Sequence, residues 1–276
     1  MSTATPAKLE TLTICHRAAT IPQKWVGKEI AVGGYSSGSS THLSRLAPGW
    51  YARYDHSHSA AALFAAPRLL QGIGEGITHV RMQQYRKVLS HVAVGRQHRE
   101  LPTLREVMPS QAASLSDTDR ALAPGCDFMV PPALSFRRTV LAHYASCHLP
   151  VDFLEYAVAA IDAGVLAENE VVDMLHEDRL IAGALELGIY PLEFFVSAVK
   201  SLEAISRRFI ERADSRLASY GADQARALSS CVERAGSYLV LAELERRFGT
   251  NVPIGTTAWI VCITDNGGGY VPGRAE

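Results

Sequence analysis

The chain has 276 residues, of which 47% are hydrophobic and 20% charged, and its formal net charge is -1. Hydrophobicity this high with so little net charge excludes an intrinsically disordered chain and fits one large or two modest globular domains. The lack of a basic excess argues against a nucleic-acid-binding protein. No apolar run reaches the roughly 18 residues that a membrane span requires.

The cysteines and the N-terminal residues indicate the compartment. The five cysteines are odd in number and no pair has the CxxC spacing, which argues against a disulfide framework or a zinc ribbon. We interpret them as reduced, mostly buried thiols. Residues 1–10 are polar and lack an apolar core, so no secretory signal is visible. We expect a protein that is cytoplasmic in the producing cell or delivered into a target cell.

Strands and loops dominate the expected structure of the N-terminal third. Residues 12–16 alternate apolar and polar side chains and predict a first strand. Residues 33–40 form a Gly/Ser-rich loop, because glycine reaches unusual backbone angles and serine bonds its own backbone. Residues 49–54 predict a second strand, and residues 60–66 a short helix that Pro67 stops.

The middle of the chain carries weaker signals. Residues 78–85 alternate and predict a third strand, and residues 88–94 predict a fourth or the second arm of a hairpin. Residues 96–132 are polar and contain five prolines. We interpret this stretch as a linker with room for one short helix.

From residue 133 the apolar residues recur at helical spacing. Prolines or capping carboxylates stand at several expected helix starts, and glycines stand at several ends. The expected helical segments are residues 134–148, 152–164, 169–187, 191–220 and 223–248.

A last apolar segment, residues 256–264, predicts a strand that is buried on both faces. A lone strand is unstable, so it must join the N-terminal strands in one sheet. The sequence therefore predicts an α+β fold: a small mixed or antiparallel sheet of N-terminal strands plus a C-terminal strand, with a large helical segment between them. The corresponding division is a strand-rich domain of residues 1–100 with 255–276 and a helical domain of residues 133–250.

Three pieces of the N-terminal third occur in an informative order. His16 and Arg17 end a strand, a Gly/Ser-rich loop follows, and then Gly49 to Tyr51 precede a helix with consecutive alanines and an aromatic residue. This order resembles the ADP-ribosyltransferase superfamily, above all its diphtheria-toxin and PARP-like branch. The resemblance implies an NAD-dependent mono-ADP-ribosyltransferase that acts on an unidentified target protein, as a bacterial toxin or effector.

The same resemblance assigns roles to residues. His16 would bind the adenosine-side ribose of NAD, and Tyr51 would stack on the nicotinamide ring. Tyr54 is a second aromatic candidate, Gly49 would let the backbone approach the cofactor closely, and Ser36 and Ser37 would line the NAD cleft. Because Arg17 follows His16 where that branch has Gly-Thr, a second mapping onto the Arg–Ser–Glu branch is open, with Arg17 binding NAD and Ser36, Ser37 or Ser39 as the serine.

The catalytic carboxylate that this chemistry needs is not evident in the final strand. Asp265 ends that strand, Glu243 and Glu245 have the Glu-x-Glu spacing within a helical pattern, and Glu276 is the last residue. These four are the candidates.

Two other functions fit the sequence. One is a non-catalytic binding protein with the same fold, and the other is a helical interaction or scaffold protein whose strands cap a bundle. Neither implies a nucleic-acid or membrane partner. His42, His56 and His58 lack an acidic partner and a ligand spacing, so we predict no metal site.

Overall fold

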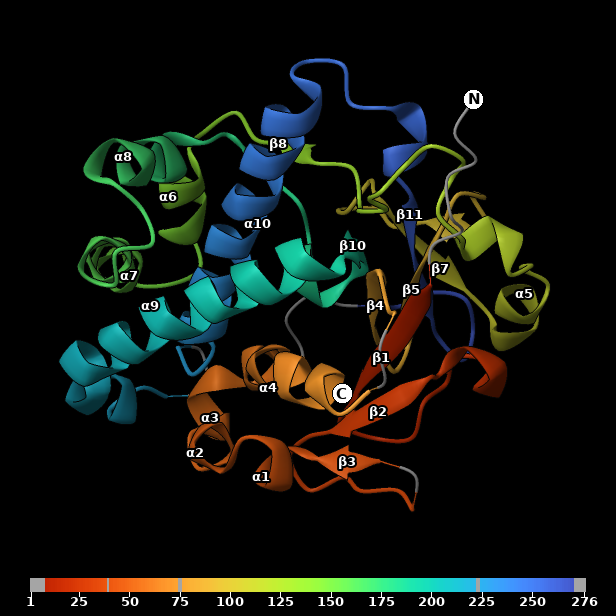
Figure 1. Ribbon diagram of the computed structural model, residues 1–276, viewed down its shortest axis with the longest axis horizontal. Helices are drawn as coiled ribbons and strands as arrows, with labels where there is room; N and C mark the ends of the chain where they lie inside the picture. Colours follow the sequence, from red (N-terminus) through yellow and green to blue (C-terminus); the bar gives the residue numbers. More distant parts are fainter. Residues whose placement is uncertain (1–7, 39, 74–75, 222–223, 271–276) are drawn as a thin grey trace.

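A nine-stranded mixed sheet organises the computed structural model, which describes residues 8–38, 40–73, 76–221 and 224–270 (Figure 1). The sheet order is β3-β2-β1-β4-β5-β11-β7-β6, and β10 pairs with β4. The strands of this sheet are β1 (Leu9–Cys15), β2 (Lys28–Ala31), β3 (Thr41–His42), β4 (His79–Gln84), β5 (Lys87–Ser90), β6 (Arg96–Gln97), β7 (Leu104–Val107), β10 (Gly188–Pro191) and β11 (Trp259–Ile263). A separate pair joins β8 (Leu134–Ser135) to β9 (Arg179–Leu180).

The first half of the sheet is parallel. β1 pairs in parallel with β2 on one side and β4 on the other, and β2 pairs in parallel with β3. The carboxyl ends of these four strands therefore lie along one edge, which is where ligands bind in open α/β sheets. β4 then turns directly into β5 through an antiparallel hairpin that pairs Gln84 with Lys87.

Helices cover one face of the sheet, and a thinner layer covers the other (Figure 1). The helices are α1 (Leu43–Leu46), α2 (Pro48–Tyr51), α3 (Tyr54–Ser57), α4 (Ser59–Gln71), α5 (Pro109–Ala113), α6 (Val140–Tyr144), α7 (Pro150–Asp162), α8 (Glu168–His176), α9 (Leu192–Ala218) and α10 (Ala227–Phe248). Four short 3-10 turns are η1 (Gln23–Trp25), η2 (Thr118–Arg120), η3 (Ala184–Glu186) and η4 (Ile254–Thr256).

The largest cluster of buried apolar side chains joins the sheet to the helical layer. It contains Leu12 of β1, Met82 of β4, Phe64 of α4, Phe195 of α9 and Leu228 of α10. The alanines from Ala60 to Ala62 in α4 are fully buried, and their small side chains let this helix approach its neighbours closely. The division into residues 1–100 with 255–276 and 133–250 stays a prediction, and this cluster draws on both parts.

The α+β expectation is confirmed, and so is the return of the last strand to the N-terminal sheet. β11 pairs antiparallel with β5, opposing Val261 to Val88, and also pairs in parallel with β7. The expected hairpin at residues 78–94 is β4 and β5. The sheet is larger than expected, because β6 and β7 come from the segment interpreted as a linker and β10 lies at the junction of two expected helices.

Four element predictions are wrong. The helix expected to stop at Pro67 runs on to Gln71 as α4, with Pro67 inside it. Residues 49–54 are helical instead of a strand, since Pro48 occupies the first turn of α2 with the backbone angle that a helix needs. Residues 134–148 contain the short strand β8 before α6 begins at Val140. The expected helix at residues 169–187 ends at His176, and β9 and η3 follow.

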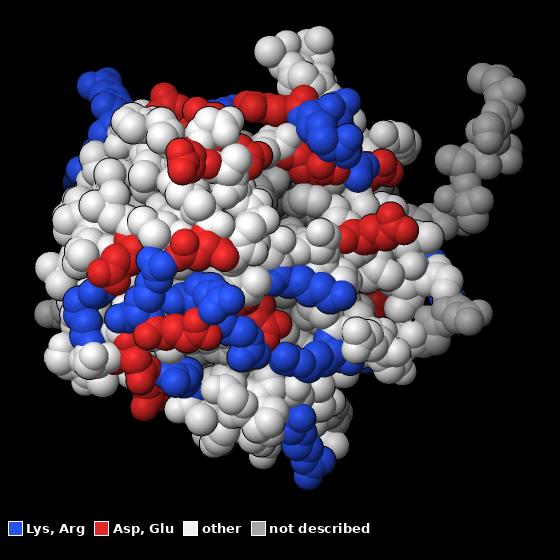
Figure 2. Space-filling model, turned by 60° about the vertical axis from the view of Figure 1, so that its left-hand side comes forward, with Lys and Arg blue, Asp and Glu red and all other residues white. Residues whose placement is uncertain are grey.

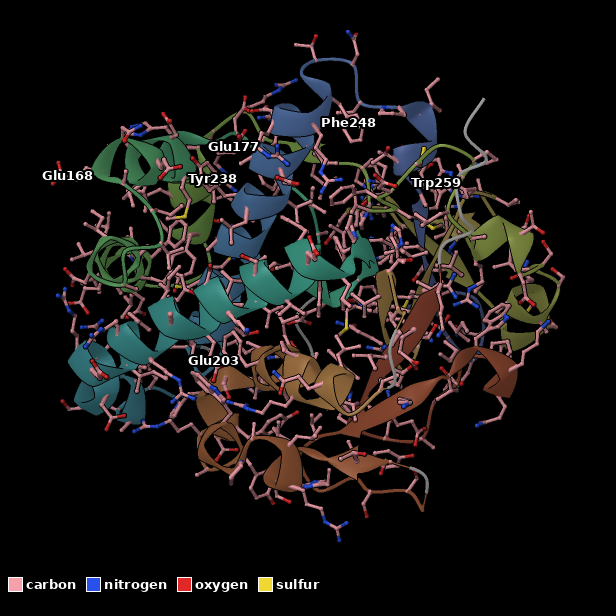
Figure 3. The ribbon with its side chains drawn as sticks, viewed as in Figure 1. Glu168, Glu177, Glu203, Tyr238, Phe248 and Trp259 are labelled. Carbon is pink, nitrogen blue, oxygen red and sulfur yellow. The ribbon has the colours of Figure 1, made fainter. Side chains whose placement is uncertain are left out.

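The exposed surface of α9 carries charges of both signs, which alternate on the face shown in Figure 2. Within α9, Arg207 pairs with Glu203 and Arg208 pairs with Glu211. Figure 3 shows Glu203 beside α3 and α4, where its carboxylate also accepts a bond from the Trp50 indole at 2.8 Å. None of the helices in the described ranges is long and apolar enough to cross a membrane.

Candidate active site

The candidate site lies at the carboxyl ends of β1 and β4. His16 and Arg17 follow β1, and Tyr85 and Arg86 form the turn from β4 into β5. The rings of His16 and Tyr85 meet edge to face with centroids 4.3 Å apart. Arg17 Nη2 donates a 3.0 Å hydrogen bond to the Tyr85 hydroxyl, and its guanidinium lies 5.0 Å from the centre of that ring. Tyr85 is buried, so it fixes both residues at the edge.

Positive charge surrounds His16. Desolvation and the charges of Arg17, Arg86, Arg226 and Lys87 together lower the pKa of His16 to about 4. A histidine with this pKa is uncharged at neutral pH. The edge therefore combines four cationic side chains with a neutral imidazole, an arrangement that favours an anionic ligand.

Tyr270 holds two of these cations in place. The Lys87 ammonium donates a 2.8 Å bond to the Tyr270 hydroxyl, and the Arg86 guanidinium lies 5.1 Å from the ring centre. The Tyr270 backbone N–H donates a 2.8 Å bond to the carboxylate of Glu106 on β7. Its carbonyl lies 3.0 Å from Nε2 of His98, which donates this bond in the matching tautomer. Tyr270 is therefore anchored to the sheet on one side and to Lys87 on the other.

One carboxylate faces the same edge. Glu186 ends η3, and its Oε2 accepts a 3.1 Å bond from Nε2 of Gln84, the last residue of β4. Burial raises the pKa of Glu186 to about 7, and the charge of Glu233 raises it too, while a hydrogen bond from Ser59 and the charge of Lys87 oppose the shift. A carboxylate that titrates near neutrality can take a proton from a hydroxyl.

The start of α4 closes the site from the helical side. His58 precedes this helix with φ of 43° and ψ of -127°. This conformation is rare outside glycine and stores backbone strain, which is found most often at functional sites. Desolvation first, and then the charge of Arg226, lower the pKa of His58. Burial raises the pKa of Tyr54, which also senses Arg226 and Glu186.

The structure places the residues expected to bind a cofactor in two groups. His16, Arg17 and Tyr54 belong to the strand-end site. Tyr51 is 41% exposed in α2, where its ring meets that of His42 at 5.2 Å. Gly49 is also exposed in α2.

The serines lie beside β2. The Ser37 hydroxyl donates to the carboxylate of Glu29, which is buried, while Ser36 is exposed. Ser39 lies outside the described residues.

The expected catalytic carboxylates lie in other surroundings. Glu243 binds Arg246 and Arg247 within α10, and Glu245 binds Arg179 of β9 at 2.8 Å. Asp265 follows β11 in the turn that leads to Gly267. Glu276 lies outside the described residues.

Sequence reasoning missed Gln84, Glu186 and Arg226. Gln84 lies next to the end of the strand predicted at residues 78–85, so its position at the edge could have been found. Glu186 and Arg226 come from segments interpreted as plain helix, and only the tertiary fold brings them to β1 and β4. In the described ranges, no group of three or more His, Cys, Asp or Glu side chains is placed to hold a metal ion.

The architecture is thus a mixed α/β sheet whose parallel strands end at a cationic edge. The chain is similar to the apo structure of the bifunctional glycosyltransferase WbbM, with a TM-score of 0.68 and 11% sequence identity. The match covers 93% of this chain but only 45% of the WbbM chain, so this chain spans about half the length of that protein. No protein-family model and no curated protein matches the sequence.

This likeness corrects the functional expectation. The fold is one found in a glycosyltransferase, which transfers sugars, and the resemblance to ADP-ribosyltransferases is wrong, together with the toxin or effector role that it implied. The physical reason is visible at Gly49 to Tyr51, which lie in α2 instead of the strand that the resemblance requires. The likeness supports neither the non-catalytic binding protein nor the scaffold. NAD as a cofactor followed from that resemblance alone and stays a prediction.

Proposed function

We propose that this chain is a glycosyltransferase that moves a sugar from a nucleoside diphosphate donor to a hydroxyl acceptor. The observation that carries the proposal is the pairing of a cationic cluster with a carboxylate of raised pKa at the carboxyl edge of a parallel sheet. The shared fold with a glycosyltransferase supports the same class.

The cations fit the leaving group. When the bond between the sugar's anomeric carbon and the diphosphate breaks, negative charge develops on the diphosphate. Arg17, Arg86, Lys87 and Arg226 all lie close enough to His16 to lower its pKa, so they converge on one region. Preorganised cations at this region stabilise the departing diphosphate without reorganising solvent.

Glu186 fits the role of the general base. The acceptor hydroxyl attacks the anomeric carbon, the hydroxyl proton passes to the Glu186 carboxylate, and the bonding electrons of the broken C–O bond leave with the diphosphate. Because Glu186 titrates near neutrality, it can accept this proton at physiological pH. One displacement with one base inverts the configuration at the anomeric carbon.

Donor turnover tests the proposal. Purified protein is incubated with UDP-, GDP-, ADP- and dTDP-sugars, and the release of nucleoside diphosphate is measured with and without a glycan acceptor. We expect at least one donor to be hydrolysed slowly by water and faster with a suitable acceptor. Failure of every donor to bind or turn over would contradict the proposal.

A further inference from the structure

A cavity of about 360 Å³ lies on the face of the sheet opposite α4 and α9, because Leu12 and Met82 point to the helices and their neighbours Thr11 and Arg81 point the other way. Four segments line it: the neighbouring strands β1 and β4 through Thr11 and Arg81, the η1 turn through Lys24 and Trp25, and the η2 region. Arg81 lies on β4, four residues before Tyr85 of the turn that follows. At about 3.3 Å per residue, this separates the cavity from the strand-end site along the sheet.

Cationic side chains dominate this cavity. Lys24, Arg81 and Arg120 line it, and Asp117 is the one carboxylate among its lining residues. Lys24 and Asp117 lie at the exposed rim, with Nζ and Oδ1 3.9 Å apart. The lining therefore carries an excess of two positive charges.

The Arg120 guanidinium lacks the partners that a buried cation requires. Arg120 is 2% exposed and stacks 4.0 Å from the centre of the Trp25 ring. Its Nη2 donates a 2.7 Å bond to the Gln83 amide oxygen, while its Nε has no hydrogen-bond partner in the described structure. Burial, and then the charge of Arg81, lower the pKa of Arg120 to about 9. Burying a charge without a carboxylate in contact is costly.

Arg81 is in a similar position. Its Nη2 donates a 2.6 Å bond to the backbone carbonyl of Arg120, and burial lowers its pKa to about 10. In the described ranges, neither Arg81 nor Arg120 has a carboxylate within 4.0 Å. Arg120 is buried and Arg81 is half-buried. Two adjacent guanidinium groups that share no carboxylate are held together more easily when an anion binds between them.

We propose that this cavity is a second ligand site that binds the phosphate monoester group of a small polar molecule. A phosphate monoester carries two negative charges, which match the charge excess of the lining, and arginine forks bind phosphate oxygens in pairs. The cavity is larger than a phosphate ion, so a sugar or similar group fits beside the phosphate, with Trp25 forming one wall. The site differs from the donor site in position and in residues.

Calorimetric titration of the full chain tests this proposal with three probes: inorganic phosphate, glucose 6-phosphate and glucose. We expect both phosphates to bind and glucose not to bind. Tighter binding of glucose 6-phosphate than of inorganic phosphate identifies a free sugar phosphate as the better ligand. Equal affinity for the two phosphates would show that the site recognises only the phosphate group, for example at the end of a longer molecule. If neither phosphate binds, the proposal is wrong.

Variants locate the site. Arg81→Gln should weaken phosphate binding about tenfold, since a bond to a charged group is lost, and Lys24→Gln about threefold because Lys24 is exposed. Asp117→Asn removes the opposing charge and should tighten binding. Lys200→Gln on α9 is the matched control and should change nothing.

Loss of phosphate binding in Arg226→Gln, with binding retained in Arg81→Gln, would assign the phosphate to the strand-end site and overturn the proposal. Donor turnover by Arg81→Gln is measured in parallel. Because Arg81 lies outside the donor site, the proposal of a phosphate site can be wrong while the proposed glycosyltransferase function is right, and the reverse.

Discussion

Gln84 Nε2 donates a 3.1 Å hydrogen bond to the carboxylate of Glu186, which lies 102 residues further along the chain. This bond joins the end of β4 to the η3 turn of the helical part. It places a carboxylate of raised pKa beside the cations that follow β1 and β4. The proposed base and the proposed diphosphate site therefore belong to one edge of one sheet.

Removing the Glu186 carboxylate should abolish general-base catalysis. Glu186→Gln keeps the bond with Gln84 possible but cannot accept a proton, so kcat should fall about 10²–10⁴-fold. The KM for the donor should change little. Steady-state kinetics with the best donor and acceptor measure both values, and an unchanged kcat would exclude Glu186 as the base.

The pH dependence of kcat follows from the same carboxylate. The base must be deprotonated, and burial raises the pKa of Glu186 to about 7, so kcat should rise with pH and level off above this value. His16, with a pKa lowered to about 4, is neutral throughout this range and should add no second step. A pH profile that is flat from 5 to 9 would contradict the assignment.

Arg226 should act on donor binding. Arg226→Gln removes one cation from the edge, and the donor KM should rise about tenfold. Arg45→Gln changes the same charge on the exposed surface of α1 and serves as the control. Equal donor KM values for the two variants would place the diphosphate elsewhere.

The conformation of His58 should cost stability. Its φ of 43° and ψ of -127° suit glycine, so His58→Gly should be about 1 kcal/mol more stable than His58→Ala. Both variants lose the imidazole, and only glycine adopts these backbone angles without strain. Chemical denaturation of the two variants gives the difference, and equal free energies of unfolding would show that no strain is stored there.

Strands with long apolar runs were predictable from the sequence. β11 could be found because residues 256–264 are continuously apolar and rich in branched side chains. β7 could not, because four residues between prolines, with the buried Glu106 among them, resemble a loop. Its strand conformation depends on pairing with β11, in a register that places Cys262 opposite Glu106, 156 residues earlier in the chain. That pairing exists only in the folded chain.

The site was predictable only where it follows a strand. His16 and Arg17 could be chosen because a strand end at the carboxyl edge is a common place for ligand binding. Tyr51 was chosen from a short motif, and Pro48 makes that segment helical instead. Glu186 and Arg226 carry no local signal. They reach the edge because β10 pairs with β4 and because α10 starts beside α3 and α4.

A structure of the protein with UDP or GDP bound tests the central claim most directly. The account predicts that the diphosphate lies at the carboxyl ends of β1 and β4, with its oxygens within 4 Å, the usual ion-pair limit, of Lys87 and Arg226. A diphosphate bound away from this edge, or no binding of either nucleotide at millimolar concentration, would contradict it.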